Sequence, residues 1–154
     1  MKTFFKITGA VLVAGWTHSL AAFTYSDTDL LLVFRKTGQN DVLCNLGNIS
    51  NYLGQAYGTI SPVTNWDFSQ VQANFGGDLS GVKYVLMAVT TSGDSPVRVW
   101  LSDSAPSGLP PNDESNSRWT QQRGKINAVG SRATAYPEVS PQTVILSPSD
   151  PNGG

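Results

Sequence analysis

The hydrophobic pattern of the chain is organised around residues 30–34, Leu-Leu-Leu-Val-Phe, an unbroken apolar run that follows shortly after the first twenty positions. The run ends in Arg35 and Lys36 and is followed by the turn-forming residues 37–40. An apolar stretch of this length without polar alternation is typical of a strand buried on both faces. We therefore expect residues 30–35 to form the central strand of a sheet.

Two β-hairpins are predicted from the flanking pattern. The first runs from the central strand into residues 41–46, because the intervening turn contains glycine and asparagine. The second joins residues 82–90 to residues 96–102 through a polar turn. A further apolar run, 143–146, lies between two prolines and can add one more strand.

The returning strand of the second hairpin alternates clearly between apolar and other residues. Val97, Val99 and Leu101 are expected to face the core. Arg98 and Trp100 then face a different environment on the opposite side of the strand.

Two helices complete the expected elements. Residues 65–76 carry Phe68, Val71 and Phe75 at spacings of three and four, which places an apolar stripe on one helical face. A second, more polar helix is predicted over residues 118–134. Its thin apolar stripe consists of Trp119, Ile126 and Val129.

These elements predict a mainly β protein with short helices. The expected architecture is an antiparallel sheet or a β-sandwich, built from two hairpins with one or two helices packed on it. At 154 residues the chain is long enough for one domain with a core and short for two. We assign residues 23–146 to a single β-rich domain and residues 147–154 to a flexible tail or a truncated end.

Residues 1–22 have the pattern of a secretory signal peptide. Lys2 and Lys6 supply a positive start, and a short apolar segment of about ten residues follows, against the roughly 20 that a membrane span needs. The small residues at Ala21 and Ala22 suit cleavage by a signal peptidase. We therefore expect a cleaved leader and a secreted protein with no membrane span after its removal.

Removal of the leader changes the chemistry that remains available. Loss of Lys2 and Lys6 leaves eight basic residues against eleven acidic ones, a net charge of −3. Nucleic acid and anionic lipid need clustered basic groups, so neither is an expected partner. The single histidine, His18, is also removed with the leader. Its loss excludes a Ser-His-Asp catalytic triad and a His-ligated metal site in the mature chain.

The single cysteine, Cys44, cannot form an intrachain disulfide. Cross-linking of two chains through this thiol is one interpretation. Because Cys44 lies in the alternating segment 42–46, we favour a small buried apolar side chain.

The carboxylates are the remaining candidates for chemistry, and they are scattered at predicted turns and strand ends. A retaining glycosidase needs two carboxyl groups about 5 Å apart. Aspartate is also an ordinary turn and cap residue, so we expect no enzymatic activity. Asp27 and Asp29 have the residue types of a calcium site without the spacing of a known loop. We therefore expect no cofactor, with calcium as the alternative.

Exposed aromatic residues offer an alternative role as a carbohydrate-binding module. Sugar rings stack on aromatic side chains, and adjacent polar groups bond their hydroxyls. The candidate residues are Trp100, Arg98, Trp119 and Tyr57. The competing interpretation is that Trp100 packs beneath a helix, as large aromatic residues usually do.

Several motifs together resemble a known family. The signal-like start is followed by Asp-Leu-Leu-Leu-Val-Phe-Arg-Lys-Thr-Gly at 29–38, by Val-Leu-Cys-Asn-Leu-Gly at 42–47, and by a helix from Asn65-Trp66 to Phe75-Gly76. This order resembles exported bacterial proteins of the PEP-CTERM/exosortase type over residues 23–102. The defining Pro-Glu-Pro motif with its apolar helix is not present in these 154 residues, and Ala135 to Val139 does not match it. The chain is then either truncated before that signal or a relative without it.

The resemblance implies an exported protein of the periplasm, cell surface or extracellular matrix of a Gram-negative bacterium, active in matrix or biofilm. Such a protein has extracellular polysaccharide or other matrix proteins as its expected partners. No catalytic residues carry over from this family. The expected role is therefore a non-catalytic structural or binding role.

Overall fold

The computed structural model describes residues 22–56, 58–60, 62–63, 65–91, 93–102 and 116–147. The predicted leader up to Ala21, the tail 148–154 and the glycan candidate Tyr57 lie outside the described residues. Ala22 is the first described residue, and it is exposed.

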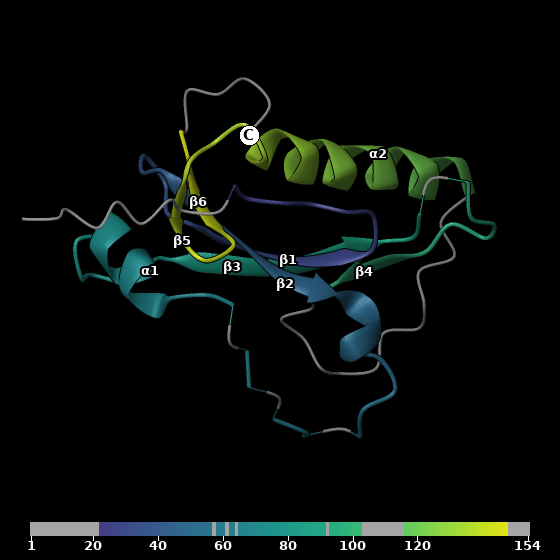
Figure 1. Ribbon diagram of the computed structural model, residues 1–154, viewed down its shortest axis with the longest axis horizontal. Helices are drawn as coiled ribbons and strands as arrows, with labels where there is room; N and C mark the ends of the chain where they lie inside the picture. Colours follow the sequence, from purple (N-terminus) through teal and green to yellow (C-terminus); the bar gives the residue numbers. More distant parts are fainter. Residues whose placement is uncertain are drawn as a thin grey trace, which may run out of the picture.

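In the described part of the chain, six antiparallel strands form one sheet in the order β4-β3-β1-β2-β6-β5 (Figure 1). This confirms the predicted mainly β class with two helices and an antiparallel sheet. The third hairpin, β5 with β6, adds a strand that the sequence pattern did not indicate. The strands are β1 Asp29–Arg35, β2 Asp41–Asn48, β3 Lys83–Val89, β4 Val99–Leu101, β5 Glu138–Ser140 and β6 Thr143–Leu146.

Strand β1 lies inside the sheet between β2 and β3, and both of its faces are covered. Leu30 and Leu32 belong to one core cluster, and Leu31 and Val33 belong to another. All four side chains are at most 8% exposed. The prediction of a strand buried on both sides is therefore confirmed.

Each face of the sheet has its own helix. On the face of Leu30 and Leu32, which we call the α1 face, lie the helix α1 (Phe68–Asn74) and the short 3-10 helix η1 (Ile49–Asn51). On the opposite face, which we call the α2 face, lies α2 (Asn116–Ala133). Figure 1 shows α2 running along one side of the sheet, with η1 on the other side.

Helix α1 begins where a side chain can cap it. The Asp67 carboxylate accepts a hydrogen bond from the Ser69 N–H at 2.9 Å, which satisfies one of the free amides of the first turn. Val71 and Phe75 are buried against the sheet as expected. Phe68 was expected on the same buried stripe, but it is 42% exposed, because it occupies the first position after the cap.

Helix α2 agrees with the predicted span to within two residues at its start and one at its end. Ile126 and Ala133 are buried, and Val129 is half-buried against the sheet. Residues 23–25 pack on the same face: Phe23 is 2% exposed, and the Tyr25 hydroxyl donates to Asn127 Oδ1 at 2.7 Å. The segment directly after the predicted cleavage site is therefore part of the core.

The facing of β4 differs from the expectation. Trp100 pairs with Ala88 and packs against the core cluster of the α1 face. Leu101, which was expected to face inward, is 56% exposed. The environment of each β4 side chain depends on its partner on β3, because β4 is only three residues long and lies at the edge of the sheet.

Candidate functional site

A row of four aromatic rings lies on the α1 face, contributed by three separate parts of the chain. Phe34 stacks on Trp66 with centroids 5.8 Å apart and planes 11° apart. Tyr84 lies 6.3 Å from Phe34, and Phe68 meets Trp66 edge to face at 5.8 Å. We call this set, Tyr84-Phe34-Trp66-Phe68 in spatial order, the aromatic row.

The two ends of the aromatic row are open to solvent. Tyr84 is 66% exposed and Phe68 is 42% exposed, whereas Phe34 and Trp66 are half-buried and pack on the core. Ring pairs at these separations attract one another by about 0.5–1.5 kcal/mol beyond burial. Each inner ring therefore favours one placement of the outer ring that it contacts.

Local structure explains how the row is assembled. Antiparallel pairing of β1 with β3 places Phe34 directly opposite Tyr84. The capping residue Asp67 separates Trp66 from Phe68 and turns the chain into α1. Hydrogen bonds from Ser69 hold the pKa of Asp67 below its usual value, so this carboxylate stays ionised beside the rings at neutral pH.

The α1 face continues from Tyr84 along β3 to a small apolar hollow. Leu86 follows Tyr84 by two positions, so both side chains lie on one face of the strand. The hollow has a volume of about 220 Å³. It is lined by Leu30, Ile49, Leu86, Trp100, Leu101 and Ser102.

The predicted glycan residues do not come together. Trp100 lies in the hollow of the α1 face, packed against the core beside η1. Trp119 lies half-buried on α2, which covers the other face of the sheet. Arg98 is exposed just before β4, where its backbone bonds to Thr90.

Charged side chains near the aromatic row are balanced. Lys36 donates to Asp78 Oδ2 at 2.9 Å and to the Asp78 carbonyl at 2.8 Å. Hydrogen bonds from Ser80 and then from Lys36 hold the pKa of Asp78 well below its usual range. The two charges therefore offset each other at neutral pH.

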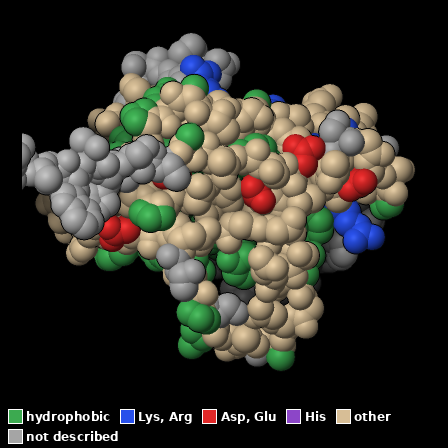
Figure 2. Space-filling view, viewed as in Figure 1, with side chains coloured by type: hydrophobic (Ala, Val, Ile, Leu, Met, Phe, Trp, Pro, Cys, Tyr) green, Lys and Arg blue, Asp and Glu red, His purple; other side chains and the backbone are tan. Residues whose placement is uncertain are grey.

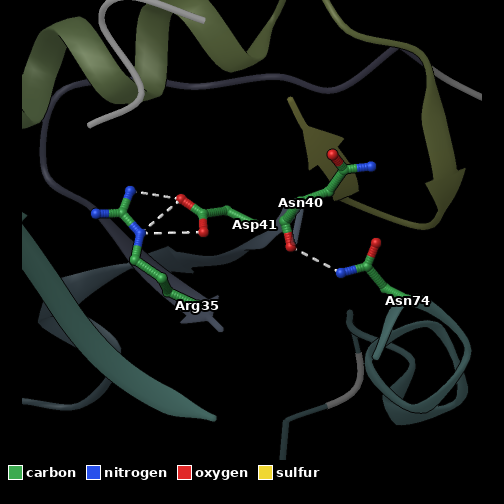
Figure 3. A network of polar contacts seen from close by, with 4 residues as sticks. All are labelled: Arg35, Asn40, Asp41 and Asn74. Atoms are coloured by element: carbon green, nitrogen blue, oxygen red, sulfur yellow. Dashed lines mark hydrogen bonds and ion pairs between the residues drawn. The ribbon is translucent and has the colours of Figure 1, made fainter. Parts of the chain in front are cut away.

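A second ion pair joins the two strands of the first hairpin (Figure 3). Arg35 Nε donates to both carboxylate oxygens of Asp41 at 3.0 Å, and this hydrogen bonding raises the pKa of Arg35. Next to it, Asn74 Nδ2 donates to the Asn40 carbonyl at 2.8 Å and ties α1 to the hairpin turn. The Asn40–Asn74 contact lies at an open polar hollow of about 480 Å³, which both residues line.

The calcium candidates Asp27 and Asp29 lie at the turn before β1. Asp29 Oδ2 accepts hydrogen bonds from the Ser26 N–H and from Asn45 Nδ2, each at 2.8 Å. Asn45 also donates to the Thr24 carbonyl, so Asp29 anchors the N-terminal segment to β2. These hydrogen bonds give Asp29 a structural role. Calcium needs six to eight oxygen ligands, so a calcium site at Asp27 and Asp29 stays a prediction.

Acidic groups are spaced apart on the face that Figure 2 shows. This face is made mostly of uncharged groups and backbone. Within the described part of the chain, no three His, Cys, Asp or Glu side chains gather to hold a metal ion. In the same part, no helix is both long enough and apolar enough to cross a bilayer.

Comparison with family models, with curated proteins and with solved structures gave no match. The aromatic row is therefore interpreted from its own geometry.

None of the four row residues is among the glycan-binding candidates predicted from the sequence. Phe34 belongs to the apolar run of the central strand, and Phe68 to an expected buried stripe. Tyr84 sits in a strand that reads as apolar on both faces. The sequence held one signal for the exposure of Tyr84 and Phe68. Both lie near the first residue of a strand or helix, where neighbouring residues bury a side chain least completely.

Proposed function

We propose that this protein is a non-catalytic exported protein of the cell envelope or extracellular matrix of a Gram-negative bacterium. The observation that supports this proposal is the use of five carboxylates in the described part of the chain as structural groups. Asp29 and Asp78 hold turns, Asp67 caps a helix, and Asp41 pairs with Arg35. Glu138 accepts hydrogen bonds from the backbone and side chain of Gln142.

Export is supported by the leader pattern in residues 1–22 and by the family resemblance of the segments that follow it. The low charge content, 14% of residues, and the mature net charge of −3 favour neither nucleic acid nor anionic lipid as a partner. Extracellular polysaccharide or other matrix proteins are the partners that fit this surface.

The exposed ends of the aromatic row favour carbohydrate binding as the second candidate function. A carboxylate-dependent glycoside hydrolase has less support. It requires two converging carboxyl groups about 5 Å apart, whereas the carboxylates named above act as structural groups.

Expression of the full chain in a Gram-negative host, followed by fractionation and intact mass measurement, tests the proposed export. We expect a protein outside the cytoplasm that begins after Ala21 or Ala22. As the control, Leu12→Arg interrupts the apolar part of the leader and should retain the chain inside the cell. Full-length protein with Met1 in the cytoplasm would overturn the proposal.

A further inference from the structure

We infer that the aromatic row binds the pyranose rings of a neutral polysaccharide, with Tyr84 and Phe68 as its contact residues. This inference rests on the proposed exported, non-catalytic role and adds a site and a ligand class to it. The apolar C–H face of a sugar ring stacks on an aromatic ring, and its hydroxyls need polar partners beside that ring.

Each exposed ring contacts a partly buried ring that favours one placement of it, which suits a weak stacking ligand. Tyr84 leans on Phe34, and Phe68 meets Trp66 edge to face, while the two inner rings stack almost in parallel. Because the rings are already ordered, binding loses little side-chain entropy.

Tyr84 also offers backbone hydrogen-bonding groups beside its ring. The Leu86 N–H donates to Ser102 Oγ and the Leu86 carbonyl accepts from the Ser102 N–H, both at 2.9 Å, so these groups point to the outer edge of β3. Backbone direction alternates along a strand, which points the N–H and carbonyl of Tyr84 to the same edge. Among the described residues, β4 pairs with β3 only from Met87 to Val89.

The short length of this edge favours a sugar over an added peptide strand. The Val82 N–H, just before β3, donates to the Leu79 carbonyl at 3.1 Å, and Leu86 is bonded to Ser102, so within the described residues Tyr84 alone presents both outward groups near the row. Strand addition depends on a series of backbone bonds. Lys83, directly before Tyr84, also disfavours edge-to-edge pairing.

The charges around the row favour a neutral ligand. Lys36 pairs with Asp78, so this pair is internally balanced, whereas the Arg35–Asp41 pair lies on the α2 face, because Arg35 alternates with Phe34 along β1. In the chain, Asp67 stands between Trp66 and Phe68 and caps α1, whereas Lys83 lies on the opposite face of β3 from Tyr84. A polyanion or a polycation thus finds no complementary field at this site.

Retention of the purified mature protein on insoluble cellulose, insoluble β-1,3-glucan and immobilised dextran tests the inference, with alginate as the anionic comparison. We expect saturable retention on at least one neutral polymer and none above background on alginate. Loss of one stacked ring is worth roughly 0.5–1.5 kcal/mol, so Tyr84→Ala and Phe68→Ala should each weaken retention by about two- to tenfold.

The matched control is Ile60→Ala, which removes an apolar side chain that is 93% exposed and does not belong to the aromatic row. We expect it to bind as the parent protein does, and unchanged circular dichroism should show that all variants fold. Failure of the parent on all three neutral polymers, stronger retention on alginate, or equal retention of Tyr84→Ala and parent would each overturn the inference. None of these binding results tests export. A cytoplasmic, unprocessed chain would instead overturn the proposed function itself.

Discussion

At the scale of single residues, Cys44 shows how burial removes reactivity from a group that the sequence left open. Its side chain is fully buried on β2, and Thr143 Oγ1 lies 3.7 Å from the sulfur. Burial raises the pKa of the Cys44 thiol to about 11, against a smaller opposing effect of the Thr143 hydrogen bond. The thiol therefore stays protonated and shielded at neutral pH.

We predict that Cys44 in the folded protein reacts with a thiol reagent at pH 8 far more slowly than in urea. The folded pKa is raised, so the protonated thiol contributes stability that is complete below about pH 9 and is lost as the pH rises toward 11. Denaturation midpoints of parent and Cys44→Ala should therefore converge over this interval. Rapid stoichiometric labelling of the folded protein, or a disulfide-linked dimer, would show that the thiol is accessible.

At the scale of elements, α2 is held on its face of the sheet by the segment that precedes β1. A Cβ atom placed on Gly130 would lie 2.5 Å from the Tyr25 ring, whereas one on Gly124 would meet nothing within 4 Å. The Tyr25 hydroxyl bonds to Asn127, so the ring cannot move away without losing that bond. Burial, followed by the charges of Asp27 and Asp29, raises the pKa of Tyr25, which keeps this hydroxyl protonated.

We predict opposite effects for two glycine substitutions in α2. Gly124→Ala should stabilise the protein by up to about 1 kcal/mol, because alanine is the better helix former at an open position. Gly130→Ala should destabilise it in spite of the same helix preference, because of the contact with Tyr25. Urea denaturation of both variants measures the difference. In a Tyr25→Ala background the cost of Gly130→Ala should disappear, and its persistence there would contradict the packing described.

The elements themselves were largely predictable, because each has a local signal. The apolar run 30–34, the glycine-containing turn after it, and the stripe of Val71 and Phe75 fix β1, the first hairpin and α1. Strand β5 was missed, since Glu138–Ser140 is only three residues long and lies between two prolines. Its formation depends on pairing with β6, which is a tertiary effect.

The aromatic row was not predictable, because it arises from pairing between distant parts of the chain. Phe34 and Tyr84 are 50 positions apart and meet through the register of β1 with β3. Periodicity assigns a residue to a face of its strand, but it does not say which strand lies alongside. For the same reason, Trp100 and Trp119 were predicted to belong to one glycan-binding site, although they lie on opposite faces of the sheet.

At the scale of the whole molecule, the two ends of the domain depend on each other. Phe23 is buried in the cluster that contains Val144 and Leu146 of β6, and Thr24 bonds to Gln142 in the β5–β6 turn. Cleavage of the predicted leader at Ala21 or Ala22 leaves this segment intact. Processing and folding are then compatible only if the mature chain keeps Phe23.

We predict that Phe23→Ala destabilises the mature protein by about 3–5 kcal/mol, the usual cost of removing a buried phenylalanine ring. The control Ser26→Ala, at an exposed position in the same segment, should change stability by less than about 0.5 kcal/mol. Equilibrium unfolding in urea gives both values. Equal stability of the two variants would mean that the N-terminal segment is not part of the core.

The central claim is that this folded exported domain binds polysaccharide through aromatic rings and performs no chemistry on it. The most direct measurement incubates the purified mature protein with cellulose and β-1,3-glucan, then assays bound protein and soluble reducing sugar in the same tube. The account predicts saturable binding that Tyr84→Ala weakens, with no sugar released by either protein. Release of soluble sugar by the parent protein would contradict it.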